Sequence, residues 1–541
     1  MKLFQTKSYE RKILEFRSYQ RSIQNYLEDI VHSRDCCIFA TEKSFSICVL
    51  FSIIMIFNSI PFVLFFAVVF FVYWILLKKS TKAQNAFLLV ASYFFYGYAD
   101  WKMLPLLMAA TLVFYFLGIG IGRSKTEKSA SWLTVLGVVL GVGLLLYFKY
   151  LDFFIESFSR MFESMGLHTN WHTFNIMMPL GVSFFTFRLI SYVVDINRGE
   201  IEPTRNIIEF ADYIAFFPCI LSGPIDKPQF INQIKQKREF DYNQADDGMR
   251  QILWGLFKKI VVADNCAVFV DNVFATYTEQ SGSILLLAAI FRAFQVYADF
   301  SGYSDMAIGV GKLLGFNITR NFNCPFFALN IADFWRRWHI SLTTWVTDYV
   351  FMPLNFQFRR KGKIGIILAI VINMLVVGLW HGANTTFLLF GLYHGILFIP
   401  LVLSGAFMKE AKLKTNKFGL PVLKDFGRMV LTFALVVVGC IIIRSESIGD
   451  AWHYFQGMMQ VGTFRASYRF FTWPGIWPSN LFVVIMLVIE WLQRDKQHGF
   501  EKPNKYRLVH NDYIGYIIYA LVLLLLILFG GKHASFIYFQ Y

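Results

Sequence analysis

One histidine stands where a purely structural membrane helix would have none. Residues 364–380 form an apolar run in which Asn373 is the only strongly polar side chain, and His381 follows directly. An ionisable side chain inside a membrane span is costly to keep and is a functional-site hypothesis by default. An imidazole there can act as a general base that takes the proton of a hydroxyl group, so that the oxygen attacks a thioester carbonyl. The alternative is a core histidine whose hydrogen bonds are satisfied within the protein.

The neighbours of His381 bear on both interpretations. A straight helix of this length rises about 26 Å, so the ring should lie well away from the basic segment that ends at Lys363. Trp380 precedes the histidine, and Asn384, three residues after it, can share its face and orient the ring. His394 lies about 220° further round a helix and is interpreted as structural.

The densest polar and aromatic cluster of the chain spans residues 334–341. Asn330 is well placed as an N-cap, with Asp333 three residues later, which resembles a capping box. Asp333 also precedes Arg337 by four residues, in the favourable acid-before-base order. The sequence therefore predicts a helix that begins at Asn330 and carries the cluster.

Two interpretations of this cluster stay open. Three tryptophans fall close to one stripe of such a helix: Trp335, Trp338 and Trp345. Tryptophan beside arginine is typical of an anchor at headgroup depth. Arg336 and His339, three residues apart, are expected to share a face. A histidine beside Arg336 and Arg337 also favours a binding site, because these cations would hold an anionic thioester carrier or a phosphate.

A second polar segment interrupts apolar sequence at Gln295, Tyr297, Asp299, Ser301, Ser304 and Asp305. Asp299 and Asp305 are candidates for ion pairs with the arginines of the 334–341 cluster. Together with Ser301 they could instead line a water-filled channel. Ser301 and Gly302 could equally mark a break between two half-spans.

Membrane helices must position these side chains. The 541 residues are 56% hydrophobic and only 16% charged, whereas soluble domains are about 25% charged. Long apolar runs without two-residue alternation predict helices. Candidate spans are 46–77, 85–99, 103–121, 131–149, 176–194, 207–222, 252–275, 283–298, 301–316, 364–380, 383–404, 429–443, 480–492 and 513–529. Because several are short or interrupted, the expected fold is an all-α polytopic membrane protein of about 11–13 transmembrane helices with re-entrant segments.

The net charge of +15 would also suit a nucleic-acid-binding protein, but its distribution argues against one. Lysine and arginine cluster in short connections between spans, as the positive-inside rule expects. The clusters are Lys78, Lys79 and Lys82; Arg123, Lys125 and Lys128; and Arg359, Arg360, Lys361 and Lys363. They define a self-consistent cytoplasmic face, and the expected partner is a lipid bilayer.

The first 45 residues are polar and charged, so we expect a polar extension over 1–45 and a single transmembrane domain over 46–541. The extension has no apolar h-region and is not a secretory signal peptide. Either translation begins at Met55, which would make residues 1–54 an upstream extension, or the segment is a cytoplasmic amphipathic element. The seven cysteines show no CxxC pair or zinc spacing, so neither a bound metal nor another bound cofactor is expected.

Five ordered motifs resemble the membrane-bound O-acyltransferase superfamily, and most of all its bacterial alginate O-acetyltransferase branch. They are residues 179–187 (PLGVSFFTF), 222–226 (SGPID), 297–305 (YADFSGYSD), the cluster at 334–342 preceded by 321–323 (NFN), and 379–382 (LWHG). The similarity begins near Met55 and continues to the C-terminus. It implies a bundle of transmembrane and re-entrant helices around a central channel.

By this resemblance His381 corresponds to the catalytic histidine and His339 to the second family histidine. The candidate channel and substrate-binding side chains are Trp335, Arg336, Arg337, Trp338, Asp299, Ser301, Asp305, Trp380 and Asn384. The resemblance implies that an acyl group, usually acetyl, passes from a cytoplasmic thioester such as acetyl-CoA towards an extracytoplasmic hydroxyl. It further implies the bacterial inner membrane, and a partner protein that completes O-acetylation of a cell-surface polysaccharide.

Other functions remain open at this point. The same scaffold serves peptidoglycan O-acetylation, other exopolysaccharides and teichoic-acid D-alanylation. A polytopic transporter or flippase could also move a polar substrate past Asp299, Arg336 and His381. The absence of internal sequence symmetry, which many secondary transporters show, counts against transport.

Overall fold

The computed structural model describes residues 55–167, 173–174, 176–460, 476–502 and 512–530. The chain divides into two units, Met1–Ile56 and Phe57–Tyr541. The expected polar extension over residues 1–45 lies outside the described residues. All the helices named below belong to the second unit.

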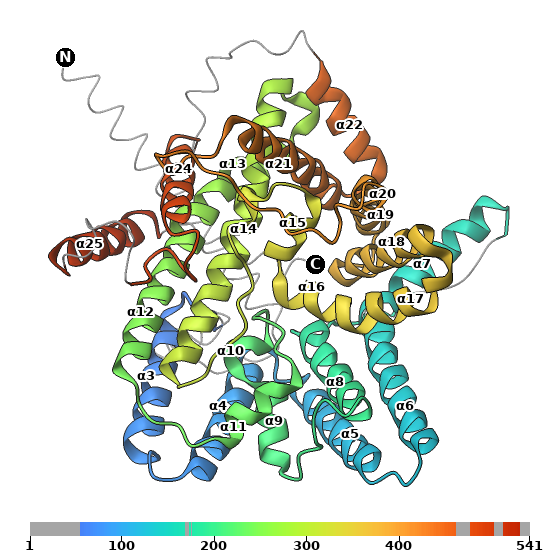
Figure 1. The fold of residues 1–541 in the computed structure, drawn as a ribbon, viewed down its shortest axis with the longest axis vertical. Coiled ribbons are helices and arrows are strands. Elements are labelled where there is room, and N and C mark those ends of the chain that lie inside the picture. The colour runs from blue at the N-terminus through green and yellow to red at the C-terminus, as the bar shows by residue number, and fades with distance from the viewer. Residues whose placement is uncertain (1–54, 168–172, 175, 461–475, 503–511, 531–541) are drawn as a thin grey trace, which may run out of the picture. The chain divides into compact units, whose positions relative to one another are not determined.

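The described part of the chain is helical and contains no β-strand. Its α-helices (Figure 1) are α3 (Ile60–Phe71), α4 (Thr81–Asp100), α5 (Leu104–Gly122), α6 (Glu127–Leu145), α7 (Leu151–Ser164), α8 (Val182–Asn197), α9 (Ile207–Ala215), α10 (Phe217–Ile220), α11 (Ile231–Lys235), α12 (Tyr242–Leu256), α13 (Asp264–Ala275), α14 (Gly282–Leu313), α15 (Ile331–Arg337), α16 (Ile340–Val346), α17 (Met352–Gln357), α18 (Gly362–His381), α19 (Thr385–Leu397), α20 (Ile399–Leu403), α21 (Leu423–Arg444), α22 (Ile448–Met459), α24 (Ile476–Leu492) and α25 (Asp512–Phe529).

Shorter helical segments join several of these helices. The π-helical segments are η1 (Val72–Leu76), η2 (Leu146–Tyr150), η4 (Phe257–Ala263) and η7 (Thr347–Phe351). The 3₁₀ segments are η3 (Pro228–Phe230), η5 (Tyr277–Glu279), η6 (Pro325–Phe327) and η8 (Arg359–Lys361). Single-turn π segments within α-helices occur frequently at functional sites, and η2 lies beside the candidate site.

The expected all-α polytopic membrane fold is confirmed. Within the described ranges, 6 helices are long and apolar enough to cross a membrane. They are Leu104–Gly122, Glu127–Ser164, Gly282–Leu313, Arg359–His381, Thr385–Leu403 and Leu423–Arg444, and shorter apolar helices cover Ile60–Leu76, Ile476–Leu492 and Gly515–Phe529. Other expected spans are polar, short or broken: 207–222, for example, is divided between α9 and α10.

The expected break at Ser301 and Gly302 is wrong, because α14 runs unbroken from Gly282 to Leu313 beside α12 and α13 (Figure 1). Gly302 serves close packing instead. A Cβ atom there would lie 2.7 Å from the carbonyl oxygen of Gly255 on α12. Small residues at such contacts let two helix backbones approach, which stabilises helix pairs in membranes.

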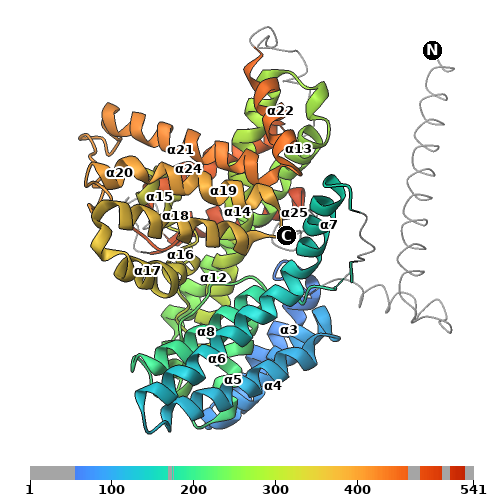
Figure 2. The same ribbon diagram turned by 90° about the vertical axis from the view of Figure 1, so that its right-hand side faces the viewer.

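Helices α18, α19 and α21 lie one upon another, while α4, α5, α6 and α8 form a second group (Figure 2). Glycine also allows the close contact between α18 and α19. A Cβ atom at Gly378 would lie 2.2 Å from the carbonyl oxygen of Phe387, and one at Gly391 would lie 2.4 Å from that of Met374. This tight hairpin fixes the end of α18, where His381 lies.

Candidate active site

His381 is the last residue of α18, at the corner of the α18–α19 hairpin. The chain reverses over residues 382–384, and Asn384 becomes the N-cap of α19. Its side-chain oxygen accepts a hydrogen bond from the Thr386 amide, and its Nδ2 donates to the Glu446 carbonyl oxygen at 2.9 Å. The expectation that Asn384 continues the helix face of His381 and orients its ring is therefore wrong.

The imidazole of His381 lies between two cavities inside the protein. His381 is 8% exposed, and its ring stands edge-on to Trp380 and Phe390 at centroid distances of 5.1 and 5.8 Å. One cavity is apolar, measures about 50 Å³ and is lined by residues that include Trp335, Trp338, Phe390, His394, Val436 and Cys440. The other measures about 60 Å³, and its lining includes Lys149, Leu180, Gly181, Ser183, Leu221 and Trp380. A base between them can meet a reacting group from either side.

His394 shares the apolar cavity with His381, although the sequence placed it on another face. That angular argument assumed one continuous helix, whereas the reversal before α19 brings the second histidine back. The Trp335 indole N–H donates to Nδ1 of His394 at 3.4 Å. His394 therefore holds Trp335 in the wall of the cavity, which agrees with a structural role.

His339 is fully buried and has a left-handed backbone with φ 46° and ψ 53°. It follows the end of α15 and is the N-cap residue of α16, so the expected shared helix face of Arg336 and His339 is wrong. A non-glycine residue in this conformation costs about 1–3 kcal/mol and persists only where its surroundings hold it. Here the amide of Ile340 donates to the Asn321 carbonyl oxygen at 2.8 Å. Strain of this kind clusters at functional sites.

The Asn321 side chain also fixes the tautomer of His339. Its Oδ1 accepts hydrogen bonds from the amide and hydroxyl of Ser341, and lies 3.0 Å from Nδ1 of His339. Because a carboxamide oxygen only accepts, Nδ1 carries the proton and Nε2 the lone pair. Burial, and then the nearby His381, hold the pKa of His339 well below its usual range. The His339 ring stands edge-on to Trp380 at a centroid distance of 5.3 Å.

Helix α15 begins as the sequence predicts. Asn330 accepts from the Asp333 amide at 2.9 Å, and Arg337 Nε pairs with Asp333 Oδ1 at 2.8 Å. The Arg337 side chain is therefore engaged in an ion pair within its own helix. Arg336 is exposed and donates to the Phe407 carbonyl oxygen at 2.7 Å.

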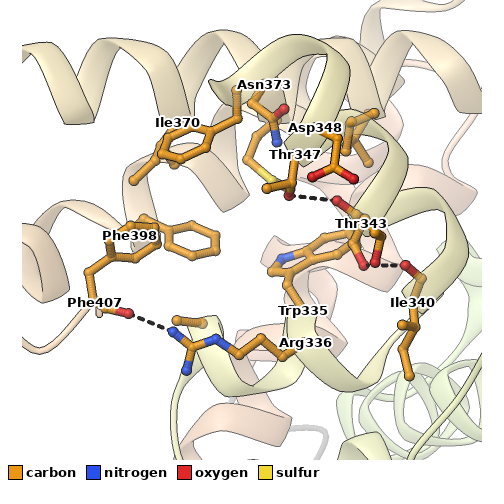
Figure 3. A pocket seen from close by; sticks show the side chains of 16 residues that line it. Trp335, Arg336, Ile340, Thr343, Thr347, Asp348, Ile370, Asn373, Phe398 and Phe407 are labelled. Carbon is orange, nitrogen blue, oxygen red and sulfur yellow. Dashed lines mark hydrogen bonds between the residues drawn. The ribbon is translucent and has the colours of Figure 1, made fainter. Parts of the chain in front are cut away.

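Arg336 lines an open pocket of about 340 Å³ between α15, α16 and α18. In Figure 3 the guanidinium reaches towards Phe407, while Asp348 and Asn373 lie on the opposite side of the pocket. Along α18 the lining continues from Ile370 to Val377, one turn before His381. Trp335 lines both this open pocket and the apolar cavity at His381, so its indole separates the two spaces.

The tryptophans of the cluster are packed inside the protein, so the interpretation as headgroup anchors is wrong for two of them. Trp335 is 5% exposed and Trp345 is 6% exposed, and the Trp345 ring stacks on Phe187 at 3.7 Å. Trp338 is half-buried, stands edge-on to Phe322 at 5.1 Å and reaches the apolar cavity.

The two buried aspartates of α14 pair with lysines of η4, and not with the arginines that the sequence suggested. Lys258 Nζ lies 2.5 Å from Asp305 Oδ2. Lys259 Nζ lies 2.7 Å from Asp299 Oδ1 and 2.8 Å from Asp264 Oδ1. These pairs are buried and join α14 to η4 and α13.

Ser301 and Asp305 also line a narrow polar cleft of about 20 Å³ on the α14 side of the site. Ser304 lines the same cleft, and its hydroxyl accepts a hydrogen bond from Asn321 Nδ2 at 3.1 Å. Since Asn321 holds His339, the polar face of α14 supports that histidine through one intervening side chain.

Two side chains that the sequence analysis did not single out cap the end of α18. Lys149 Nζ donates to the Trp380 carbonyl oxygen, and the Tyr150 hydroxyl donates to that of Leu379, each at 2.5 Å. Both belong to η2. In the sequence, Lys149 stands at the end of an apolar run, where a lysine is typical of the flank of a membrane span. The one local feature that could have indicated a functional role is its position between two aromatic residues.

Among the residues with a described position, no group of three or more histidine, cysteine, aspartate or glutamate side chains could hold a metal ion. The polar and aromatic side chains that line the candidate site carry imidazole, indole, guanidinium and ammonium groups. Such a set suits proton transfer and anion binding.

Comparisons with known proteins agree with this chemistry. The model of the membrane-bound O-acyltransferase family matches residues 95–444. A probable alginate O-acetylase of Pseudomonas syringae is 35% identical over 415 residues, which cover 76% of this chain and 77% of the relative. A peptidoglycan O-acetyltransferase of Helicobacter pylori is 31% identical over 75% of this chain and 80% of the relative. A teichoic acid D-alanyltransferase of Bacillus subtilis is 31% identical over 41% of this chain and 58% of the relative.

Proposed function

The chain belongs to the membrane-bound O-acyltransferase family and is a multi-pass membrane O-acetyltransferase; we propose that it transfers acetyl from a cytoplasmic thioester to a hydroxyl of a cell-surface polysaccharide. The observation that carries the proposal is the position of His381 between two cavities. Acetyl-CoA is the proposed donor, and the bacterial inner membrane the proposed location. On the intact polymer an extracytoplasmic partner would complete the transfer, whereas a short soluble oligosaccharide is proposed to accept acetyl from the chain directly.

In the proposed reaction His381 takes the proton of the acceptor hydroxyl, and the oxygen attacks the thioester carbonyl carbon. The carbonyl π electrons move to oxygen and form a tetrahedral intermediate. When the C=O bond re-forms, the C–S bond breaks and the thiolate takes the proton from the imidazolium. Acetyl ester and free thiol are the products, and His381 is again neutral. A positioned base of this kind contributes about 10²–10⁴-fold to a rate.

The open pocket is the proposed entrance for the donor. It follows α18 from the side of the basic segment Arg359–Lys361 towards His381, and ends at Trp335. Aromatic and threonine side chains line it, with Arg336 at its edge. A guanidinium there suits the phosphates of a coenzyme or the phosphopantetheine of a carrier protein.

His339 and Trp380 are proposed to form the wall opposite the apolar cavity. Trp380 stands edge-on to both histidine rings, so it fixes the spacing between them. With the proton on Nδ1, the Nε2 lone pair of His339 suits a group that accepts a hydrogen bond from a second hydroxyl of the acceptor, not from the one that reacts. His381 is assigned the proton transfer, and His339 the positioning.

Reconstituted protein tests this function directly. Liposomes that contain the purified chain receive radiolabelled acetyl-CoA together with alginate oligosaccharides or muropeptides. We expect label in the oligosaccharide fraction as an alkali-labile ester. A parallel sample receives D-alanine on its carrier protein instead. Transfer of D-alanine without any transfer of acetyl would contradict the proposal.

Replacing Arg336 with alanine is expected to raise the KM for acetyl-CoA about tenfold or more, because losing a hydrogen bond to a charged group costs about 1.5–3 kcal/mol. Its neighbour Arg337 is a matched control. Arg337→Ala removes the ion pair with Asp333 and should lower the midpoint of thermal unfolding with little change in the KM. Equal shifts of both quantities in the two variants would show that Arg336 is structural.

A further inference from the structure

Lys149 lies beside His381, although it comes from the first third of the chain. It lines the same cavity of about 60 Å³ as His381, from the π-helical segment η2. One of its three N–H groups donates to the Trp380 carbonyl oxygen at 2.5 Å, and its ammonium lies 5.8 Å from the Trp380 ring centroid. The Lys149 ammonium group is therefore held beside Trp380, the residue that precedes His381.

Lys149 is half-buried, and no carboxylate matches its charge in the way that carboxylates match the buried lysines of η4. Lys258 pairs with Asp305, and Lys259 pairs with both Asp264 and Asp299. No carboxylate of the described residues lies within ion-pair distance of Lys149. An unmatched cation inside a membrane protein is costly. The cost is offset if negative charge develops in the cavity during a reaction.

We propose that Lys149 is a catalytic residue that stabilises the oxyanion of the tetrahedral intermediate. The inference rests on the proposed function, because the thioester carbonyl oxygen gains its negative charge only when the acceptor oxygen attacks. His381 takes the proton of the acceptor hydroxyl, and the acceptor oxygen attacks the thioester carbon. The π electrons of the C=O bond then move to the carbonyl oxygen, and the Lys149 ammonium donates a hydrogen bond to this carbonyl oxygen. When the C=O bond re-forms and the thiolate leaves, Lys149 keeps its proton throughout.

Lys149 could instead serve only to cap the end of α18. A variant of Tyr150 distinguishes this capping role from stabilisation of the oxyanion. The Tyr150 hydroxyl donates to the Leu379 carbonyl oxygen at 2.5 Å, directly beside the bond made by Lys149, but Tyr150 does not line the cavity. Tyr150→Phe therefore removes a cap of the same helix end without changing the charge that faces His381. Lys149→Met removes the charge at similar length, and Lys149→Arg keeps it.

The experiment measures initial rates of acetyl transfer from acetyl-CoA to alginate oligosaccharides in liposomes, together with the thermal unfolding midpoint of each variant. Removal of one oxyanion donor typically lowers kcat about 10²–10³-fold, and we expect a loss of that size in Lys149→Met at an unchanged KM for the oligosaccharide. Lys149→Arg should recover part of the rate. Tyr150→Phe should stay close to the wild-type kcat.

Three results would overturn the inference. An equal loss of kcat and of unfolding midpoint in Lys149→Met and Tyr150→Phe would assign Lys149 to helix capping. A raised KM for the oligosaccharide at unchanged kcat would assign it to binding an acidic acceptor. Unchanged kinetics in Lys149→Met would exclude any role in the reaction. Wild-type protein that transfers no acetyl would instead contradict the proposed function itself.

Discussion

Replacing His381 with alanine is expected to lower the rate of acetyl transfer by about 10²–10⁴-fold, because the reaction then lacks its positioned base. The loss should appear in kcat, since the imidazole acts on the proton that moves in the transition state. Binding of acetyl-CoA should change little, because the donor is proposed to bind in the open pocket on the other side of Trp335. Initial rates in liposomes at several donor concentrations measure both quantities.

A control is needed because His381 also packs against Trp380 and Phe390. His381→Gln keeps most of the side-chain volume without a group that titrates, so it should be as inactive as the alanine variant while unfolding at a higher temperature. His453→Ala, on the exposed face of α22, should resemble wild-type protein in both assays. Acetyl transfer that survives in both His381 variants would show that another group removes the proton.

Local patterns carried the correct predictions. The N-cap at Asn330 and the pair between Asp333 and Arg337 depend on residues three or four positions apart, and helix geometry alone fixes such contacts. The position of His381 at the end of an apolar helix follows in the same way. Each of these predictions needs no knowledge of which helices pack together.

Two incorrect predictions placed residues three positions apart on one helix face, whereas a helix ends between Arg336 and His339 and between His381 and Asn384. The other errors and omissions concern contacts between distant segments. Lys149 and Trp380 are separated by 231 positions, and nothing in either local sequence indicates the pairing. The sequence makes the aspartates of α14 candidates for ion pairs with arginines or for lining a channel, whereas packing of α14 on η4 pairs them with lysines. Charge and hydropathy define what a helix can bury, but they do not specify which neighbour completes a buried ion pair.

The buried ion pairs therefore belong to the scaffold that holds the site. Asp299 and Asp305 lie on the face of α14 where Gly302 packs against α12 and η4. Asp305 also lines the polar cleft together with Ser304, whose hydroxyl accepts a hydrogen bond from Asn321. Removing one partner of these ion pairs should therefore change the position of the His339 side chain as well as the stability of the fold.

Replacing Lys259 with methionine is expected to destabilise the protein by about 3–5 kcal/mol, the usual cost of removing one partner from a buried ion pair. The variant would leave Asp264 and Asp299 as facing carboxylates, which lay 2.8 and 2.7 Å from the lost ammonium. Unfolding in mixed detergent micelles, followed by tryptophan fluorescence against denaturant, measures the change. Lys237→Met removes the exposed pair with Glu239 and should leave the unfolding curve unchanged, because exposed pairs contribute little.

A combined variant decides whether charge balance is the cause. Lys259→Met together with Asp264→Asn and Asp299→Asn removes all three charges and keeps the carboxylate shapes. Replacing a whole buried ion cluster is often neutral, whereas breaking it is not, so the triple variant should recover most of the lost stability. If it is no more stable than Lys259→Met, the lysine contributes through its aliphatic packing and the electrostatic account of this scaffold fails.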